Sequence, residues 1–209
     1  MSRLEQLERQ YREHHANSRS PSLVYGGDER ARVFQELVRG PGLRVLDLGC
    51  RAGALTRSYV DGNDVVGIDV DRVALEEAAK LGIETRWADV EEPLDVDDEG
   101  FDVVVAGELL EHLREPERLV AEARRALRPR GLLVGSVPNA YRLKNRLRFL
   151  FGTPPERDPT HLHLFRPTDV RELLREFDDV DLRFVVGRLV PLNGRLFAND
   201  IVFSARKPG

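Results

Sequence analysis

Three aspartates and a glycine-rich turn stand where short apolar segments end, and their spacing is typical of a nucleotide-type ligand site. Asp47 opens the segment DLGCRAG, in which Gly49 and Gly53 allow a tight turn and a close approach of the backbone to a ligand. Asp69 follows about 20 residues after Gly49, where a carboxylate accepts hydrogen bonds from both ribose hydroxyls. Asp89 is placed to accept from an adenine amino group. The alternative interpretation is a simple turn cap at each strand end.

The elements that must position these residues alternate between strand and helix. Strands are predicted at Leu43–Asp47, Asp64–Asp69, Ile83–Ala88, Phe101–Ala106, Leu132–Val137, Val180–Gly187 and Asn199–Lys207, and helices at Ala54–Val60, Arg72–Lys80, Pro116–Leu127 and Thr168–Phe177. The last strand is expected to be an edge or an antiparallel partner. This alternation predicts an α/β sheet that binds its ligands at the carboxyl ends of the strands. The three aspartates and Glu108 all stand at such ends.

Composition and charge narrow the class of protein. A chain of 209 residues with 41% apolar residues predicts one soluble domain, and a net charge of −4 disfavours a protein that coats nucleic acid. Cys50 is the only cysteine, which excludes an internal disulfide and a thiolate zinc site. Because no apolar run is long enough to span a membrane and the N-terminus is polar, we expect a cytoplasmic protein without a membrane partner.

The chain divides into a helical lead at residues 1–40, expected to act as a lid, and a main domain at 41–209 with a cap-like insert at about 139–165. The insert mixes basic and aromatic side chains: Tyr141, Arg142, Lys144, Arg146, Arg148, Phe149 and Phe151. The preferred interpretation is a solvated helix face with its aromatic side chains docked below. The alternative is a cap that recognises an anionic acceptor.

Four segments, in this order and spacing, carry a family resemblance: VLDLGCRAG, GIDVD, ADV and FDVVVAGELLEHL. They resemble the class I S-adenosylmethionine-dependent methyltransferases over about residues 40–140. The resemblance implies a Rossmann-like, doubly wound sheet of seven strands, mostly parallel with an antiparallel last strand and with helices on both faces. It also implies S-adenosylmethionine as the cofactor and S-adenosylhomocysteine as the product.

The resemblance further implies which residues contact the cofactor. Asp47 and the turn containing Gly49, Cys50 and Gly53 would hold its amino-acid part, Asp69 its ribose, Val70, Asp89 and Val90 its adenine, and Gly107 and Glu108 its methyl-donor end. Arg51 departs from the pattern, because the family usually has glycine there. We expect Arg51 to fit only with ordinary backbone angles and an outward side chain. A nicotinamide-binding dehydrogenase, the nearest rival, leaves ADV and GELLEHL unexplained.

The segment GELLEH is similar to ubiquinone-pathway O-methyltransferases and to small-RNA 3′-end 2′-O-methyltransferases. In those families two glutamates and two histidines help to hold a divalent metal, and the counterparts here are Glu108, Glu111, His112 and His163. The favoured interpretation has no metal and uses His112 or His163 as general base, because imidazole titrates near neutral pH. His161 is the less favoured alternative.

These observations together predict an S-adenosylmethionine-dependent methyltransferase that methylates a hydroxyl of a small-molecule acceptor. An anionic acceptor follows only from the alternative interpretation of the basic insert. Two alternatives stay open: an RNA 2′-O-methyltransferase, which the acidic net charge disfavours, and a non-catalytic cofactor-binding protein. The sequence does not determine the acceptor or the oligomeric state.

Overall fold

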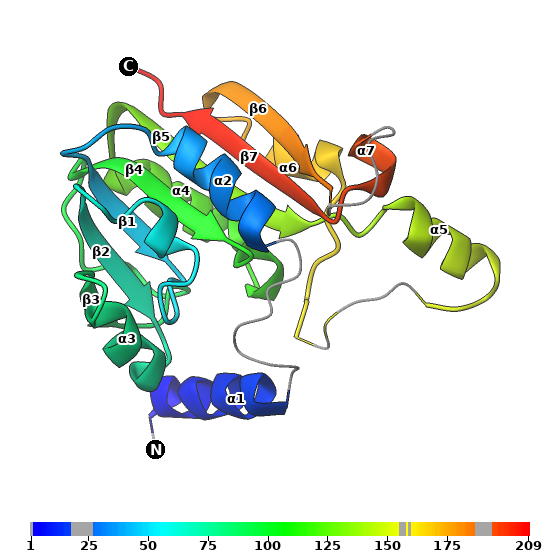
Figure 1. The fold of residues 1–209 in the computed structure, drawn as a ribbon, viewed down its shortest axis with the longest axis horizontal. Coiled ribbons are helices and arrows are strands. Elements are labelled where there is room, and N and C mark those ends of the chain that lie inside the picture. Colours follow the sequence, from blue (N-terminus) through cyan, green and yellow to red (C-terminus); the bar gives the residue numbers. More distant parts are fainter. Residues whose placement is uncertain (1, 18–26, 155–157, 159, 187–193) are drawn as a thin grey trace.

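One seven-stranded sheet forms the centre of the computed structural model, which describes residues 2–17, 27–154, 158, 160–186 and 194–209 (Figure 1). The strands are β1 (Arg44–Leu48), β2 (Asp64–Asp69), β3 (Glu84–Trp87), β4 (Phe101–Gly107), β5 (Leu127–Pro138), β6 (Asp178–Val185) and β7 (Asp200–Arg206). Their order in the sheet is β3-β2-β1-β4-β5-β7-β6, and β7 alone runs antiparallel to its neighbours. The predicted Rossmann-like sheet is confirmed, with β7 inside the sheet and β6 at its edge.

The helices are α1 (Arg3–Asn17), α2 (Gly27–Leu37), α3 (Arg72–Ala79), α4 (Pro116–Ala126), α5 (Leu143–Leu150), α6 (Pro167–Leu173) and α7 (Gly194–Phe197). Of these, α2, α3, α4 and α6 cover the two faces of the sheet, whereas α5 projects from it (Figure 1). Phe34 of α2 and Ala78 of α3 belong to one buried apolar cluster. Leu119 of α4 and Val170 of α6 belong to the other cluster. Two separate cores, one on each side of the sheet, confirm the doubly wound arrangement.

The strand register brings the predicted site residues to one edge of the sheet. Leu48 of β1 lies opposite Ile68 of β2 and Ala106 of β4, so these three strands end together. The strand order reverses between β1 and β4, which is where ligands bind in open α/β sheets. Because β7 is antiparallel, its first residue, Asp200, lies opposite Pro138 at this same edge.

Several predicted elements differ in the structure. The helix expected at Thr168–Phe177 is α6, Pro167–Leu173, and the strand expected at Val180–Gly187 is β6, Asp178–Val185. The helix expected at Ala54–Val60 is only a short 3₁₀ turn, Thr56–Ser58, because the side chains of Thr56 and Tyr59 both turn inward to the carboxylate of Asp47. Strand β5 begins at Leu127 rather than Leu132. The carbonyl oxygen of Gly131 accepts a hydrogen bond from the amide of Lys207, so the residues between the predicted helix and the predicted strand belong to the sheet.

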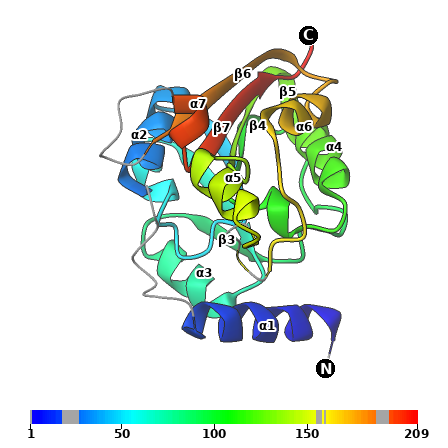
Figure 2. The same cartoon turned by 90° about the vertical axis from the view of Figure 1, so that its right-hand side faces the viewer.

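The helical lead places its two helices at different parts of the molecule. Phe34 of α2 and Val38, just after it, are buried against the sheet. Helix α1 lies instead beside α3 (Figures 1 and 2), and Glu8 pairs with Arg72 at 2.9 Å. Residues 18–26 of the lead lie outside the described residues, so its lid role stays a prediction.

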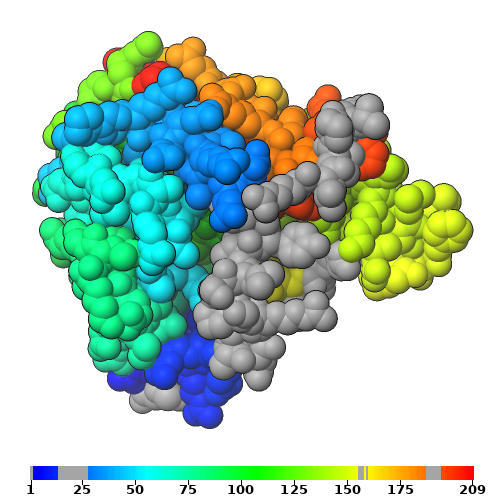
Figure 3. All heavy atoms as spheres, viewed as in Figure 1, coloured from blue at the N-terminus to red at the C-terminus, as the bar shows by residue number. Residues whose placement is uncertain are grey.

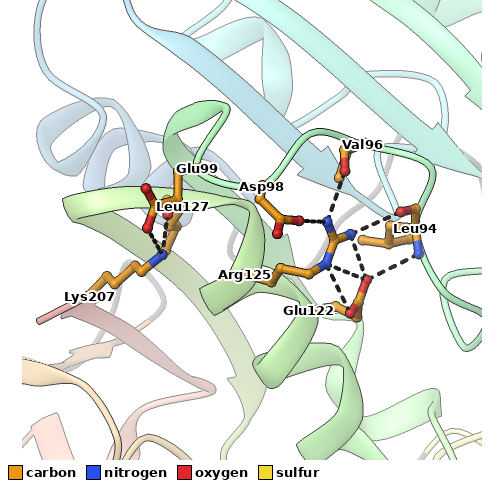
Figure 4. A network of polar contacts seen from close by, with 8 residues as sticks. All are labelled: Leu94, Val96, Asp98, Glu99, Glu122, Arg125, Leu127 and Lys207. Atoms are coloured by element: carbon orange, nitrogen blue, oxygen red, sulfur yellow. Dashed lines mark hydrogen bonds and ion pairs between the residues drawn. The ribbon is translucent and has the colours of Figure 1, made fainter.

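Arg125 on α4 fastens the loop that follows the third strand (Figure 4). Its guanidinium donates to the carbonyl oxygens of Leu94 and Val96, each at 2.9 Å, and it also pairs with Glu122 and Asp98. The amide of Leu94 in turn donates to Glu122 at 3.2 Å. This network fixes the loop that follows Asp89 and Val90, the residues predicted to contact adenine.

None of the helices within the described ranges is long and apolar enough to cross a bilayer.

Candidate active site

The loop after β1 folds back over the end of β2 and depends on glycine at two positions. Gly49 and Gly53 have φ angles of 73° and 72°, in the left-handed region that a β-carbon disfavours. The amide of Gly49 donates to the carbonyl oxygen of Ile68 at 2.8 Å, and a β-carbon on Gly53 would lie 2.7 Å from the side chain of Leu81. The two glycines therefore make the predicted tight turn.

Arg51 contradicts one expectation and meets another. Its φ is 48°, so the expectation of ordinary backbone angles is wrong. The left-handed conformation costs about 1–2 kcal/mol for a residue with a side chain. The Arg51 amide donates to Oδ2 of Asp69 at 2.9 Å, which offsets part of this cost. The side chain is exposed, as expected.

The Cys50 side chain packs against the sheet rather than facing a ligand. A β-carbon on Gly67 of β2 would lie 2.6 Å from its Sγ, so the thiol fills the space that this glycine leaves. Burial raises the pKa of the Cys50 thiol, which is neutral at physiological pH. Only the backbone of Cys50 is therefore available to a ligand.

Asp47 is a buried carboxylate with neutral partners. Its Oδ2 accepts hydrogen bonds from the hydroxyl of Thr56 at 2.5 Å and from that of Tyr59 at 2.8 Å. Burial raises the pKa of Asp47 to about 6, against the lowering effect of these two bonds. A positively charged group placed beside Asp47 would stabilise its ionised form.

Asp69 ends β2 and is tied to the backbone through both oxygens. Its Oδ1 accepts from the amide of Asp71 at 2.9 Å, and its Oδ2 accepts from that of Arg51. Burial raises the pKa of Asp69, while the two amide bonds act in the opposite direction. Each carboxylate oxygen has a second lone pair, which leaves capacity for two further donors.

Asp89 and Val90 follow β3, and Val70 follows β2. Oδ1 of Asp89 accepts from the amide of Glu91 at 2.9 Å, and Oδ2 lies 3.3 Å from the guanidinium of Arg3 on α1. Val70 and Val90 are both buried. The ion pair between Arg3 and Asp89 brings the helical lead to the residues predicted to contact adenine.

A buried ion cluster lies just past β4. Nη1 of Arg30, on α2, is 3.3 Å from Oε2 of Glu108 and 3.1 Å from Oδ2 of Asp200. Burial, together with the nearby charge of Glu108, raises the pKa of Asp200 to about 7. Within the described part of the chain, Oε1 of Glu108 has no hydrogen-bond partner. One cation thus holds two acids at the end predicted to face the methyl donor.

The carboxyl group of Glu111 is buried within the same part of the molecule. Its side chain is 1% exposed, and neither carboxyl oxygen has a hydrogen-bond partner among the residues that the structure describes. Burial and the charge of Glu108 raise its pKa well above the usual range. A buried acid with open acceptors is what a cation or a donor from a ligand would satisfy.

A hydrogen-bonded chain defines which nitrogen of His112 carries a proton. The hydroxyl of Thr160 donates to Asp158 at 2.6 Å, so its oxygen accepts from Nδ1–H of His112 at 3.0 Å. In neutral His112, Nε2 is therefore the unprotonated nitrogen, and it lies 4.0 Å from Oε1 of Glu111. Burial and the neighbouring His161 lower the pKa of His112 to about 4, so the ring is neutral at physiological pH.

The structure brings His161, rather than His163, against His112. The rings of His112 and His161 lie 4.7 Å apart between centroids, and Glu111, His112 and His161 each offer a ligand atom within 4.8 Å of the others. His163 instead donates from Nε2 to the carbonyl oxygen of Leu113 at 2.9 Å. The grouping of His163 with the two glutamates and His112 is therefore replaced by one with His161.

A cavity of about 210 Å³ opens beside this cluster. His161, His163, Asp200 and Arg142 are among the residues that line it. Through Asp200 the cavity adjoins the ion cluster of Arg30, Glu108 and Asp200. Through His161 it adjoins the group formed by Glu111, His112 and His161. Its position suits a molecule that reacts with a ligand held along the ends of β1, β2 and β4.

Sequence patterns missed several partners of the predicted residues. Thr56 and Tyr59 were assigned to a helix, although both contact Asp47. Arg30 and Asp200 are 170 residues apart and carry no motif, so only the packing of α2 over the start of β7 reveals the pair. The sequence offered one signal for Asp200, which is that an acidic residue stands at the start of the expected last strand.

These features define a Rossmann-like α/β protein with a nucleotide-type ligand site at its topological switch point. The model of the family described as a methyltransferase domain matches residues 11–178. The chain therefore belongs to the methyltransferase-domain family, as the sequence resemblance predicted.

Individual relatives agree with this assignment. A ubiquinone biosynthesis O-methyltransferase of Hahella chejuensis is 37% identical over 132 residues, covering 60% of this chain and 51% of that protein. One of Alkalilimnicola ehrlichii is 32% identical over 176 residues, covering 76% of this chain and 69% of that protein. The chain thus spans about half the length of the first relative and about two thirds of the second.

Solved structures share the fold at low identity. A SAM-dependent methyltransferase of Archaeoglobus fulgidus superposes with a TM-score of 0.66 at 18% identity, covering 99% of this chain and 100% of that one. Phosphoethanolamine N-methyltransferase 2 of Haemonchus contortus, in complex with S-adenosyl-L-methionine, gives 0.68 at 16% identity, covering 87% and 53%. Both comparisons place the sheet described above among methyltransferase folds.

Proposed function

We propose that this chain transfers the methyl group of S-adenosylmethionine to a hydroxyl group of a small-molecule acceptor. The observation that carries the proposal is the single row of polar groups along one sheet edge, from Asp89 through Asp69 and Asp47 to the histidine cluster beside the cavity. The curated relatives, named as O-methyltransferases, support a hydroxyl as the acceptor group.

The cofactor is proposed to lie along this row. The ribose hydroxyls donate to Asp69, whose oxygens keep free lone pairs. The cationic amino group of the cofactor lies near Asp47. Its positive charge would lower the pKa of Asp47, which burial raises. The other proposed contacts are the backbone of Gly49, Cys50 and Gly53 for the amino-acid part, Val70, Asp89 and Val90 for adenine, and Gly107 and Glu108 for the methyl-donor end.

The chemical step needs alignment and the removal of one proton. The acceptor oxygen attacks the methyl carbon, the carbon–sulfur bond breaks, and its electron pair stays on sulfur to give S-adenosylhomocysteine. Good alignment of the reacting atoms supplies about 7–11 kcal/mol in favourable cases. Nε2 of neutral His112 takes the hydroxyl proton, a contribution of about 10²–10⁴ in rate. His163, whose Nδ1 remains an acceptor, is the second candidate base.

The group of Glu111, His112 and His161 also fits a divalent metal. One buried carboxyl with two open oxygens and two imidazoles is a donor set that suits zinc or another transition metal better than magnesium. A bound ion would lower the pKa of a coordinated acceptor hydroxyl. His112 would then act as a ligand, and His161 would take the role that sequence reasoning assigned to His163.

Two finer features belong to the same proposal. Arg142 lines the cavity, which supports an acceptor with an anionic group. The cytoplasm is the proposed setting, supported by a sequence whose single cysteine forms no internal disulfide.

Calorimetric titration with S-adenosylhomocysteine, with EDTA or with added Mg²⁺, Mn²⁺ or Zn²⁺, tests the proposal. We expect S-adenosylhomocysteine to bind with micromolar affinity in EDTA. In a separate assay, we expect labelled methyl groups to pass from S-adenosylmethionine to hydroxylated acceptors. A metal that tightens binding would assign the Glu111 group to an ion. The absence of any binding would overturn the proposed function.

A further inference from the structure

Helix α5 carries an exposed apolar end that the proposed chemistry does not use. Phe149, Leu150 and Phe151 are consecutive, large and 75–79% exposed, and Leu147, one turn earlier, is 45% exposed. The preferred interpretation from sequence, with these aromatic side chains docked below the helix, is therefore wrong. Figure 3 shows the yellow-green segment that contains α5 standing out from the body of the molecule. Grouped exposed apolar side chains of this kind mark interaction sites.

The same segment is strongly basic. Residues 141–153 contain Arg142, Lys144, Arg146 and Arg148 and no acidic residue, although the whole chain has a net charge of −4. Nε of Arg146 and Nε of Arg148 donate to the carbonyl oxygens of Tyr141 and Pro154, which carry no formal charge. The projecting helix thus combines an apolar end with a local positive charge.

We propose that α5 docks this protein on the surface of an anionic lipid membrane. Phe149, Leu150 and Phe151 enter the boundary between headgroups and acyl chains, while the basic residues of α5 face the lipid phosphates. An eight-residue helix is about 12 Å long, far short of a hydrocarbon core of about 30 Å, so the contact is peripheral. The sequence expectation of no membrane partner considered only spanning segments.

The chemistry of the patch favours lipid over other occupants. A second copy of the chain bound through the same helix would bring two sets of four cations together, which like-charge repulsion opposes. A nucleic acid would satisfy the cations and stack on the two phenylalanines, but it would leave Leu147 and Leu150 without an apolar partner. An anionic bilayer satisfies the positive charge and the aliphatic side chains at once.

Docking would also place the cavity at the membrane surface. Arg142 and Asn145, at the start of α5, line the cavity beside His161. A protein held by the end of α5 therefore presents this cavity close to the lipid headgroups. The inference goes beyond the proposed function and does not depend on it, because it rests on the outer surface of α5 alone.

Co-sedimentation of the full chain with vesicles tests the proposal. We expect the protein to bind vesicles of equal parts phosphatidylcholine and phosphatidylglycerol, to ignore pure phosphatidylcholine, and to dissociate as salt rises. The double variant Arg146→Glu/Arg148→Glu should bind at least about fivefold more weakly for each cation removed. Phe149→Ser/Phe151→Ser should lose binding. Val73→Ser and Lys80→Glu, at exposed positions on α3 and just after it, are matched controls that should bind as the wild type does.

Three results would overturn the docking proposal. These are no binding of the wild-type protein to anionic vesicles, an equal loss in the α3 controls, or a dimer in sedimentation velocity that the phenylalanine variant dissociates. Patch-dependent binding of single-stranded RNA in place of vesicles would also reject it and favour a nucleic-acid partner. Thermal unfolding of every variant shows whether the fold is intact, and titration with S-adenosylhomocysteine tests the proposed function separately, so a failure of docking is distinguishable from a failure of the proposed function.

Discussion

The backbone amide of Arg51 donates a hydrogen bond to Oδ2 of Asp69 at 2.9 Å and ties the loop after β1 to the end of β2. The carboxylate proposed to hold the ribose therefore also fixes the shape of the loop proposed to hold the amino-acid part. Binding at these two places is linked through one side chain. The first two predictions follow from this bond.

Replacing Asp69 with alanine should weaken cofactor binding strongly. The change removes the proposed ribose acceptor and releases the amides of Arg51 and Asp71. Hydrogen bonds to a charged group contribute about 1.5–3 kcal/mol, which predicts a loss of about 10- to 100-fold in affinity for S-adenosylhomocysteine. Asp64→Ala, at the exposed start of the same strand, is the control and should bind normally. Unchanged affinity in Asp69→Ala would remove the ribose assignment.

Arg51→Gly should stabilise the protein slightly. Glycine relieves the left-handed strain of about 1–2 kcal/mol, but it adds about 0.4–1 kcal/mol of entropy to the unfolded chain. The net gain in the free energy of unfolding, measured by urea denaturation, should be about 0.5–1 kcal/mol. Arg51→Ala keeps the β-carbon and should show no gain. A loss of stability in the glycine variant would mean that the arginine side chain contributes to the fold.

Asp47→Asn should raise stability at neutral pH while weakening cofactor binding. The folded-state pKa of Asp47, about 6, lies above the ordinary value of 3.8, so keeping the buried group ionised costs up to about 3 kcal/mol above pH 6. Below about pH 4 both states bind the proton and this cost disappears. The variant should therefore unfold at a higher temperature than the wild type at pH 8, and at a similar temperature at pH 4. A gain independent of pH would contradict the proposed cause.

His112→Gln should lower turnover by about 10²–10⁴ and leave the affinity for S-adenosylhomocysteine unchanged. Because the base must be unprotonated and its pKa is about 4, the wild-type rate should fall only as the pH drops toward 4, instead of near 6.5. The same assay on His163→Gln compares the two candidate bases. If His163→Gln loses the rate and His112→Gln keeps it, the proton acceptor is His163.

Arg30→Met should destabilise the protein by about 3–5 kcal/mol, because it leaves the buried Asp200 and the half-buried Glu108 without their shared cation. Adding Asp200→Asn should recover part of this loss by removing one of the two charges. Thermal unfolding of both variants measures the effect. Equal stabilities of the single variant and the wild type would show that the cluster is solvated in solution.

Periodicity and motif spacing were sufficient for the sheet and for the polar residues that end its strands. Runs such as DVVGID and FDVVVA are typical of buried parallel strands, and the carboxyl ends of such strands meet at one edge. Asp47, Asp69 and Glu108 were therefore predictable as neighbours. The spacing of the glycines predicted the loop but not the left-handed backbone of Arg51, which a contact with the next strand stabilises.

What depended on long-range packing was decided only by the tertiary structure. His161 and His163 are equally good partners for His112 by residue type, and the direction in which residues 160–164 cross the site selects His161. Arg30 meets Asp200 because α2 packs over the start of an antiparallel strand. Phe149 and Phe151 read as core side chains in a sequence pattern, yet α5 projects from the sheet and leaves them exposed. Local sequence specifies which groups are present and which strand carries them, whereas contacts between distant segments specify which groups meet.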